Sequence, residues 1–165
     1  IKKNEEEKII KEFSNYNNKY YIFRLPNVVG KWCKPNYNSV VSTFCHNILN
    51  NNKSKIINKN NILNIVSVDS VIDNFQKIIN NNIKSGIKYI KPNYRISVYK
   101  LYNKISEFKT LGSEYKHGII QEGLEKILYS VFISHLPSKK ITVNLNNKFD
   151  SRGSFFELLK TQNSG

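Results

Sequence analysis

The sequence predicts an α/β fold, because short apolar runs typical of buried strands alternate with segments whose apolar residues recur at helical spacing. The first such run ends at Leu25, where Pro26 stops it, and a helical segment follows at 38–50. A second run at 63–68 leads directly into another helical segment. Strands that are each followed by a helix are typical of crossover units in a parallel sheet.

The elements of the first half can be justified in order. Residues 3–15 have helical periodicity with no capping residue before them, so we expect the chain to start inside a helix and to be a piece of a longer protein. A strand at 20–25 follows, and then a loop to Tyr37. The next helix can be capped by Asn38 or Ser39, whose short polar side chains accept a bond from a first-turn N–H group.

Two short strands are then expected, near 55–58 and at 63–68. Asp69 or Ser70 can cap the helix that follows them. Its apolar residues fall at helical spacing, and they are Val68, Val71, Ile72, Phe75, Ile78 and Ile79. A low-complexity stretch rich in asparagine and lysine at 48–64 is interpreted as a loop region.

Two further helices are predicted in the second half, after a strand at 88–90. Ser97 caps the first of them. Its apolar face consists of Val98, Leu101, Ile105 and Phe108. The second runs over 119–135 and is closed by Pro137. Its apolar face consists of Leu124, Ile127, Leu128, Val131 and Phe132, and we assign the neighbouring Tyr129 and His135 to structural packing rather than to a ligand.

Beyond Pro137 the pattern changes to strict alternation at 141–146, which predicts a strand with one buried face. We therefore expect a domain boundary here, with one domain at 1–138 and the start of another at 139–165.

The chain carries a formal net charge of +14, which suggests a nucleic-acid partner because lysine and arginine neutralise phosphates. Its only arginines are Arg24, Arg95 and Arg152, however, whereas arginine dominates direct base readout. The lysines are scattered among asparagines and isoleucines, so we favour an ordinary solvated surface and expect no nucleic-acid partner. A basic nucleic-acid-binding or interaction module remains an alternative.

The two cysteines, Cys33 and Cys45, are too few for a disulfide framework, so we expect a cytoplasmic setting. Cys33, Cys45 and His46 do not form a convincing metal set, because neighbouring helix residues point to different faces and no fourth ligand is suggested. We predict no metal site. No apolar run approaches the roughly 20 residues that a membrane span needs, and no membrane partner is expected.

The candidate ligand site is the loop after the first strand. Asn27 and Gly30 tolerate the backbone angles of a turn, and Lys31 and Lys34 bring positive charge. The N-terminus of the following helix opens beside Ser39, where backbone N–H groups favour anions. In a parallel sheet, ligands bind at the carboxyl ends of strands. Together these features predict a cradle for a diphosphate.

This loop and helix, GKWCKPNYNSVVSTFCHNI at 30–48, resemble the extended short-chain dehydrogenase/reductase superfamily. In particular they resemble the bifunctional capsular-polysaccharide enzymes that reduce a UDP-linked 4-keto-hexulose. The resemblance continues through 96–109, 124–137 and 150–161. It implies the C-terminal half of a Rossmann-type reductase domain with its substrate-binding subdomain, followed by the first strands of a cupin domain.

The segment DSRGSFFE at 150–157 resembles the opening hairpin of cupins that act on nucleotide sugars. Arg152 can offer a bidentate fork to a phosphate or carboxylate, and Gly153 permits a close backbone approach. A β-bulge stabilised by a pair between Arg152 and Glu157 is the alternative. The histidine cluster that would hold a cupin metal is not present in this chain.

The resemblance implies that a tyrosine donates a proton to the ketone while NADPH delivers hydride, and that a lysine four residues later lowers the pKa of the tyrosine and holds the nicotinamide ribose. Glu7 matches the glutamate that follows this lysine by four, which makes Lys3 the candidate for both roles. The tyrosine would precede Ile1, so the chain alone should not catalyse reduction. Lys3 as an ordinary surface lysine, or Lys2 with Glu6 as another register, remain alternatives.

The resemblance also assigns binding residues. Pro26, Asn27 and Val28 would contact the nicotinamide of NADP(H), and Asn27 would also contact the substrate. The remaining predicted contacts to the UDP-sugar are Lys34, Asn36, Asn38 and Ser39. The full-length protein is expected to be a homodimer. A nucleotide-sugar epimerase or dehydratase of the same fold is the alternative enzyme.

Overall fold

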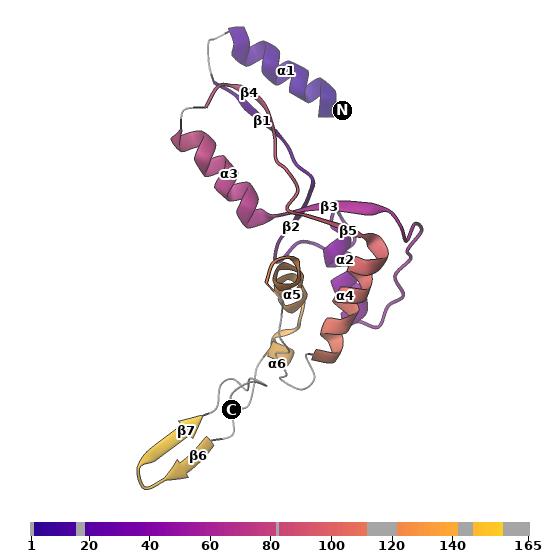
Figure 1. Ribbon diagram of the computed structural model, residues 1–165, viewed down its shortest axis with the longest axis vertical. Coiled ribbons are helices and arrows are strands. Elements are labelled where there is room, and N and C mark those ends of the chain that lie inside the picture. The colour runs from indigo at the N-terminus through magenta and orange to yellow at the C-terminus, as the bar shows by residue number, and fades with distance from the viewer. Residues whose placement is uncertain (1, 16–18, 82, 112–121, 142–146, 157–165) are drawn as a thin grey trace. The chain divides into compact units, whose positions relative to one another are not determined.

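The computed structural model describes residues 2–15, 19–81, 83–111, 122–141 and 147–156 (Figure 1). The chain forms two compact units, each assembled from separate stretches of sequence. Unit 1 comprises Ile1–Val28 and Asn64–Arg95, and unit 2 comprises Val29–Leu63 and Ile96–Gly165. These two units do not test the domain boundary that was expected after residue 138, which stays a prediction.

Unit 1 contains a parallel pair of strands, β1 (Tyr21–Arg24) and β4 (Gly86–Tyr89). Backbone bonds extend this ladder at both ends, from Gly86 N–H to Tyr20 O at 2.9 Å and from Ile90 N–H to Arg24 O at 3.2 Å. Gly86 has a φ of 126°, a conformation that only glycine adopts at low cost. The strand predicted at 20–25 is therefore confirmed and belongs to a parallel pair.

Helix α3 (Val68–Asn80) packs on this pair. Val66, Val71 and Ile90 form a buried cluster, and the rings of Phe23 and Phe75 lie against it with centroids 4.2 Å apart. The expected cap at residue 69 or 70 is wrong, because strand β3 (Ile62–Ser67) runs straight into the helix. Ser67 is the cap, and its hydroxyl accepts a bond from the N–H of Ser70 at 3.1 Å.

Helix α1 (Lys2–Asn15) is bonded to β1 through Arg24. The guanidinium donates to both carboxylate oxygens of Glu6, at 2.6 and 3.3 Å, and to the hydroxyl of Tyr89 at 3.0 Å. The hydrogen bond from Arg24 lowers the pKa of Glu6. Arg24 thus has structural partners, and its bidentate fork is the geometry in which arginine binds carboxylates best.

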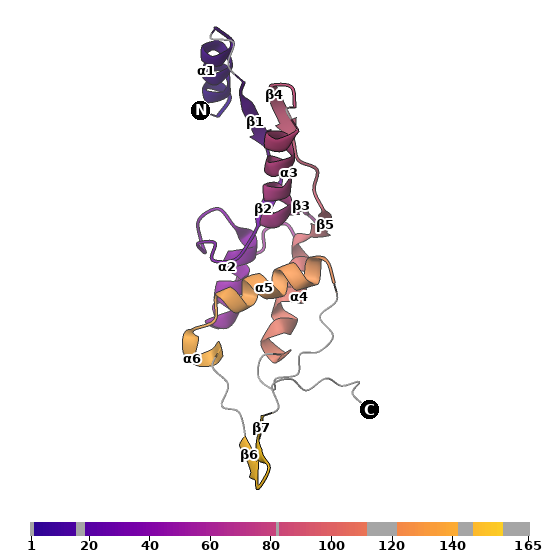
Figure 2. The same cartoon turned by 90° about the vertical axis from the view of Figure 1, so that its left-hand side faces the viewer.

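The core of unit 2 is a cluster of three helices, α2 (Val40–Leu49), α4 (Val98–Leu111) and α5 (Leu124–Ser134), which Figure 2 shows grouped together. Burial confirms most of the apolar faces predicted for α4 and α5, with Val98, Leu124 and Ile127 only half-buried. The buried side chains are Val41, Phe44, Cys45, Ile48, Leu101, Ile105, Phe108, Leu128, Val131 and Phe132. Ser97 caps α4 as predicted, accepting from the N–H of Lys100 at 3.3 Å. Tyr129 packs edge-on against Phe108, as expected for a structural residue.

A short helix, α6 (Ser138–Ile141), and an antiparallel hairpin of β6 (Asn147–Asp150) and β7 (Gly153–Phe156) follow. In the hairpin turn Arg152 pairs with Asp150 at 2.8 Å, which lowers the pKa of the Asp150 carboxyl. The strand predicted at 141–146 falls largely outside the described residues, as does Glu157, and Ile141 itself ends a helix.

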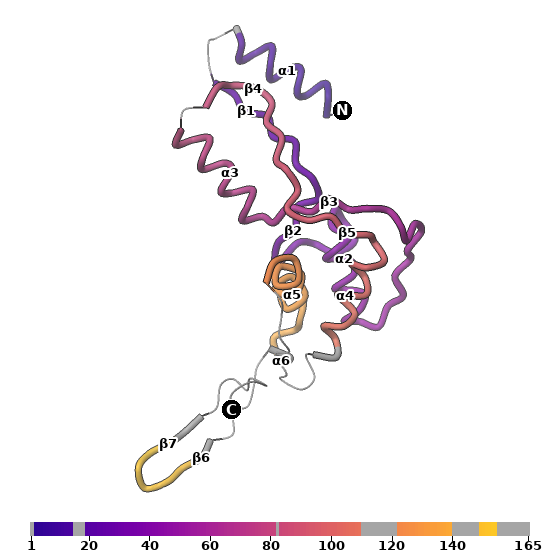
Figure 3. Tube along the Cα trace, viewed as in Figure 1, coloured from indigo at the N-terminus to yellow at the C-terminus, as the bar shows by residue number. Residues whose placement is uncertain are grey.

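Two short strands were not predicted, β2 (Asn27–Val29) and β5 (Tyr94–Ser97), which form a sheet in the order β2-β3-β5. Each follows a proline-containing turn, so its three or four residues look like loop. The strand expected near 55–58 is wrong, because this stretch is irregular (Figure 3). Ile57 is 89% exposed, and Ile56 is only half-buried. Within the described residues, no helix is long and apolar enough to cross a membrane.

Candidate functional site

The predicted site residues fall into two groups of four. Lys3 is exposed in the first turn of α1. Pro26 immediately precedes β2, and Asn27 and Val28 begin it, so that all four lie within unit 1. The other four lie together in unit 2, on one loop and at the start of α2, and they are Lys34, Asn36, Asn38 and Ser39.

In unit 1 the side chain of Asn27 has a structural partner. Its amide donates to the carbonyl oxygen of Asn64 at 3.0 Å, which fixes the start of β2 beside β3. Val28 is 37% exposed and Asn27 is also exposed. The side-chain oxygen of Asn27 and its second amide proton are therefore the groups that a ligand could use.

In unit 2 the loop at 30–39 has an unusual backbone. Trp32 and Asn36 both have left-handed conformations, with φ of 59° and 56°. Asparagine tolerates this region, but it is an outlier for a residue as bulky as tryptophan. The indole of Trp32 is 80% exposed and the ring of Tyr37 is 74% exposed. These two rings therefore contribute little to the core. Exposed aromatic rings on a loop with a constrained backbone are typical of a ligand-binding loop.

The loop ends at the cap of α2. Of the two predicted capping residues, Ser39 has this role, and its hydroxyl accepts from the N–H of Ser42 at 3.2 Å. Asn38 stays exposed beside it. Lys31 and Lys34 are exposed on the same loop, with the Lys31 ammonium 5.9 Å from the Trp32 ring centroid. Positive charge and a helix N-terminus together suit an anionic ligand.

Two hydroxyl groups that the sequence did not single out bind this loop. Thr43 Oγ1 accepts from the N–H of Asn36 at 2.9 Å, and Ser134 Oγ accepts from the N–H of Trp32 at 3.2 Å. A threonine four residues after a capping serine is a weak sequence signal for such a bond. Ser134 lies 102 residues from Trp32, and nothing local in the sequence connects them.

Cys45 is fully buried, and burial raises the pKa of its thiol to about 12. Cys33 lies on the loop and is half-buried. Cys45 is therefore a packed core residue, whereas Cys33 is a partly accessible loop residue. His135 caps α5, and its pKa is lowered by burial and then by the nearby charge of His46. In the part of the chain that the structure describes, no three His, Cys, Asp or Glu side chains gather as metal ligands.

We expect a thiol reagent at pH 8 to modify Cys33 in the native chain and to leave Cys45 unmodified, because a buried neutral thiol is a poor nucleophile. Ellman's reagent should then release one equivalent of thiolate from the native chain and two in denaturant. Cys33→Ser should abolish the native reaction. Rapid release of two equivalents from the native chain would show that α2 is not packed as described.

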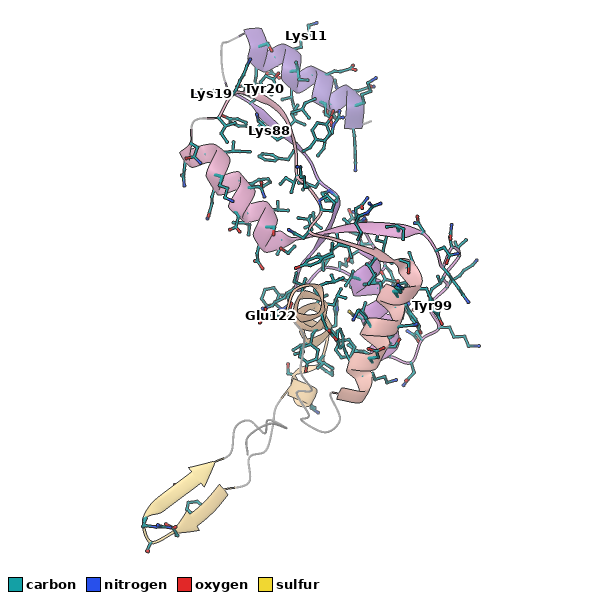
Figure 4. All side chains as sticks on the ribbon, in the orientation of Figure 1. Lys11, Lys19, Tyr20, Lys88, Tyr99 and Glu122 are labelled. Carbon is teal, nitrogen blue, oxygen red and sulfur yellow. The ribbon has the colours of Figure 1, made fainter. Side chains whose placement is uncertain are left out.

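The lysines do not gather on one element. Figure 4 labels Lys11 on α1, Lys19 before β1 and Lys88 on β4. Others are paired with carboxylates, as Lys126 is with Glu122 at 3.0 Å. Lys59 lies over the ring of Tyr99 at 5.4 Å. This distribution favours the solvated-surface interpretation over a contiguous nucleic-acid face.

No protein-family model matches the chain. It is 38% identical over 146 residues to the UDP-2-acetamido-2,6-beta-L-arabino-hexul-4-ose reductase of Pseudomonas aeruginosa, covering 88% of this chain and 39% of that protein. Its structure matches the capsular polysaccharide assembling protein CapF of Staphylococcus aureus with a TM-score of 0.71 at 34% identity, covering 94% of this chain and 44% of CapF. The chain thus spans less than half the length of either relative.

The chain also resembles more distant solved structures, and this resemblance concerns the fold alone. The UDP-glucose 4-epimerase of Thermotoga maritima, solved with UDP-glucose, matches with a TM-score of 0.61 at 18% identity over 78% of this chain and 50% of that one. Together with the parallel strand pair and the helices described above, this match confirms the predicted α/β fold class. Over nearly its whole length, the chain is therefore similar to part of the UDP-sugar 4-keto-hexulose reductase and CapF proteins, which confirms the resemblance that its motifs predicted.

Proposed function

We propose that the chain is the nucleotide-sugar-binding part of a longer, NADPH-dependent reductase that acts on a UDP-linked 4-keto-6-deoxy-hexulose during synthesis of capsular or surface polysaccharide precursors. The observation that carries this proposal is the 38% identity to a reductase of such a sugar across 88% of the chain. Coverage of only 39% of that protein supports a fragment. The proposal extends to a cytoplasmic homodimer and to a cupin that begins after residue 138.

On the substrate side, the loop in unit 2 supplies the groups that a UDP-sugar needs. The Lys34 ammonium and the N-terminus of α2 would hold the diphosphate, because both favour negative charge. Asn36 and Asn38 offer amide groups that can both donate and accept, which suits a uracil or a sugar hydroxyl. The Ser39 hydroxyl accepts a hydrogen bond from the N–H of Ser42, and its own proton is still available to donate to a ligand.

On the cofactor side, the candidate residues of unit 1 would contact the nicotinamide end of NADP(H) and no other part of the cofactor. Asn27 and Val28 are exposed at the start of a strand, and Lys3 is exposed on α1, so these groups are open to a ligand. The glycine-rich turn that binds the rest of a dinucleotide does not occur in this sequence. The bound cofactor would supply hydride, while Lys3 would hold the ribose and lower the pKa of a tyrosine outside this chain.

The test is calorimetric titration of the 165-residue chain with UDP and with the UDP-sugar. We expect Lys34→Ala to weaken binding of UDP about tenfold or more, because a hydrogen bond to a charged group contributes about 1.5–3 kcal/mol. Lys126→Ala is the matched control, since Lys126 lies in the same unit but pairs with Glu122. Absence of UDP binding to the unaltered chain would reject the proposal.

An epimerase or dehydratase of the same fold is the second candidate, favoured by the match to UDP-glucose 4-epimerase. The two differ in their redox balance. A reductase consumes one NADPH for each sugar, whereas an epimerase leaves the cofactor pool unchanged. Following NADPH absorbance with the longer protein would separate them.

A further inference from the structure

Two hydroxyl groups, from different helices, bind the loop that carries Lys34, Asn36 and Asn38. On α2, Thr43 Oγ1 donates to the carbonyl of Ser39 at 2.7 Å and accepts from the N–H of Asn36 at 2.9 Å. On α5, Ser134 Oγ donates to the carbonyl of Val131 at 2.6 Å and accepts from the N–H of Trp32 at 3.2 Å.

The direction of these bonds matters. A hydroxyl has one proton, and here that proton is used by a carbonyl of the helix. The oxygen is thereby oriented with its lone pairs toward the loop, where it can only accept. Each hydroxyl therefore works as a fixed acceptor for one loop N–H group, built onto a helix whose own position is set by the buried core.

Both loop residues that are held in this way have left-handed backbones, at φ of 59° for Trp32 and 56° for Asn36. This conformation is disfavoured for residues other than glycine and persists only where neighbouring structure imposes it. Lys34 lies between these two residues, so the bonds fix the loop on either side of the lysine.

We propose that Thr43 and Ser134 are positioning residues that hold the 31–38 loop in the conformation that binds the diphosphate and base of the UDP-sugar. This inference rests on the proposed function. It adds two residues, one of them on a distant helix, that touch no ligand and act by preorganising the residues that do. Preorganisation raises affinity because less conformational freedom is lost on binding.

Other hydroxyls in unit 2 show what a purely helical role would look like. Ser130 Oγ donates to Ile127 O at 2.8 Å on α5, and Ser106 Oγ donates to Tyr102 O at 2.9 Å on α4. Within the described residues, neither of them is bonded to the loop. The bond into the helix is therefore ordinary, and the accepted loop N–H is what distinguishes Thr43 and Ser134.

The experiment compares Ser134→Ala and Thr43→Val with the matched control Ser130→Ala and the conservative variant Thr43→Ser, all in the 165-residue chain. The dissociation constant of UDP is measured by calorimetry. We expect it to rise about two- to tenfold in Ser134→Ala and in Thr43→Val, as the loss of one neutral hydrogen bond allows. Ser130→Ala should stay within twofold of the unaltered chain, and Thr43→Ser should retain its affinity.

A second measurement reports on the loop itself. Trp32 is the only tryptophan of the chain, so its fluorescence anisotropy follows the loop without labelling. We expect the anisotropy to fall in Ser134→Ala and not in Ser130→Ala, even where the two variants melt at the same temperature. If Thr43→Val does not fold, the comparison of Ser134→Ala with Ser130→Ala still decides the question.

The results separate the two proposals. Binding of UDP by the unaltered chain, with equal affinities in Ser134→Ala and Ser130→Ala, would overturn the positioning role alone. Failure of the unaltered chain to bind UDP would overturn the proposed function and, with it, this inference.

Discussion

Phe108→Ala should destabilise the chain by about 3–5 kcal/mol, the usual cost of removing a buried phenyl ring. The Phe108 side chain is 1% exposed, and it joins two helices of the core. Its ring centroid lies 5.2 Å from that of Tyr129 and 5.8 Å from that of Phe132, both on α5. The alanine would leave a cavity between α4 and α5 that neighbouring side chains fill only in part.

Urea denaturation followed by circular dichroism measures this change as a shift of the unfolding midpoint. Phe149→Ala is the matched control, because the same atoms are removed from a ring that is 75% exposed on the hairpin. It should change the free energy of unfolding by no more than about 0.5 kcal/mol. Equal shifts in the two variants would mean that α4 and α5 do not pack in solution as described here.

Much of this core could be predicted from the sequence, because helical periodicity is a local signal. Leu101, Ile105 and Phe108 repeat at helical spacing, and all three are buried. The short strands β2 and β5 could not be predicted in this way. β2 and β5 have three and four residues, too few to show alternation, and their positions depend on pairing with β3 rather than on their own sequence.

The candidate site likewise has features that the local sequence predicts and features that depend on tertiary packing. Lys34 and the cap at Ser39 could be predicted, since charge and capping are local properties. The bond from Trp32 to Ser134 could not, because it joins residues that approach only after α5 has packed against α2. The left-handed backbone of Trp32 runs against its local preference and is likewise a product of the folded loop.

In the longer reductase proposed above, Lys3→Met should reduce kcat for the proposed reduction of the UDP-linked keto sugar by about 10²-fold or more. This size follows from the usual contribution of a positioned proton donor, whose pKa Lys3 is proposed to lower. Methionine keeps much of the length of the side chain and removes the charge. Because Lys3 is exposed on α1, the change should leave folding intact, and the melting temperature should confirm this.

Lys2→Met is the matched control, since Lys2 is the neighbouring exposed lysine on the same helix. The pH profile of kcat gives the decisive readout. Removing the ammonium should move the basic limb of the Lys3→Met profile to higher pH, because the tyrosine loses the positive charge that favours its ionised form. If Lys2→Met instead loses activity and shifts the profile, the catalytic pair is one residue out of register, with Glu6 in place of Glu7. If neither variant loses activity, the lysine on this helix surface has no catalytic role.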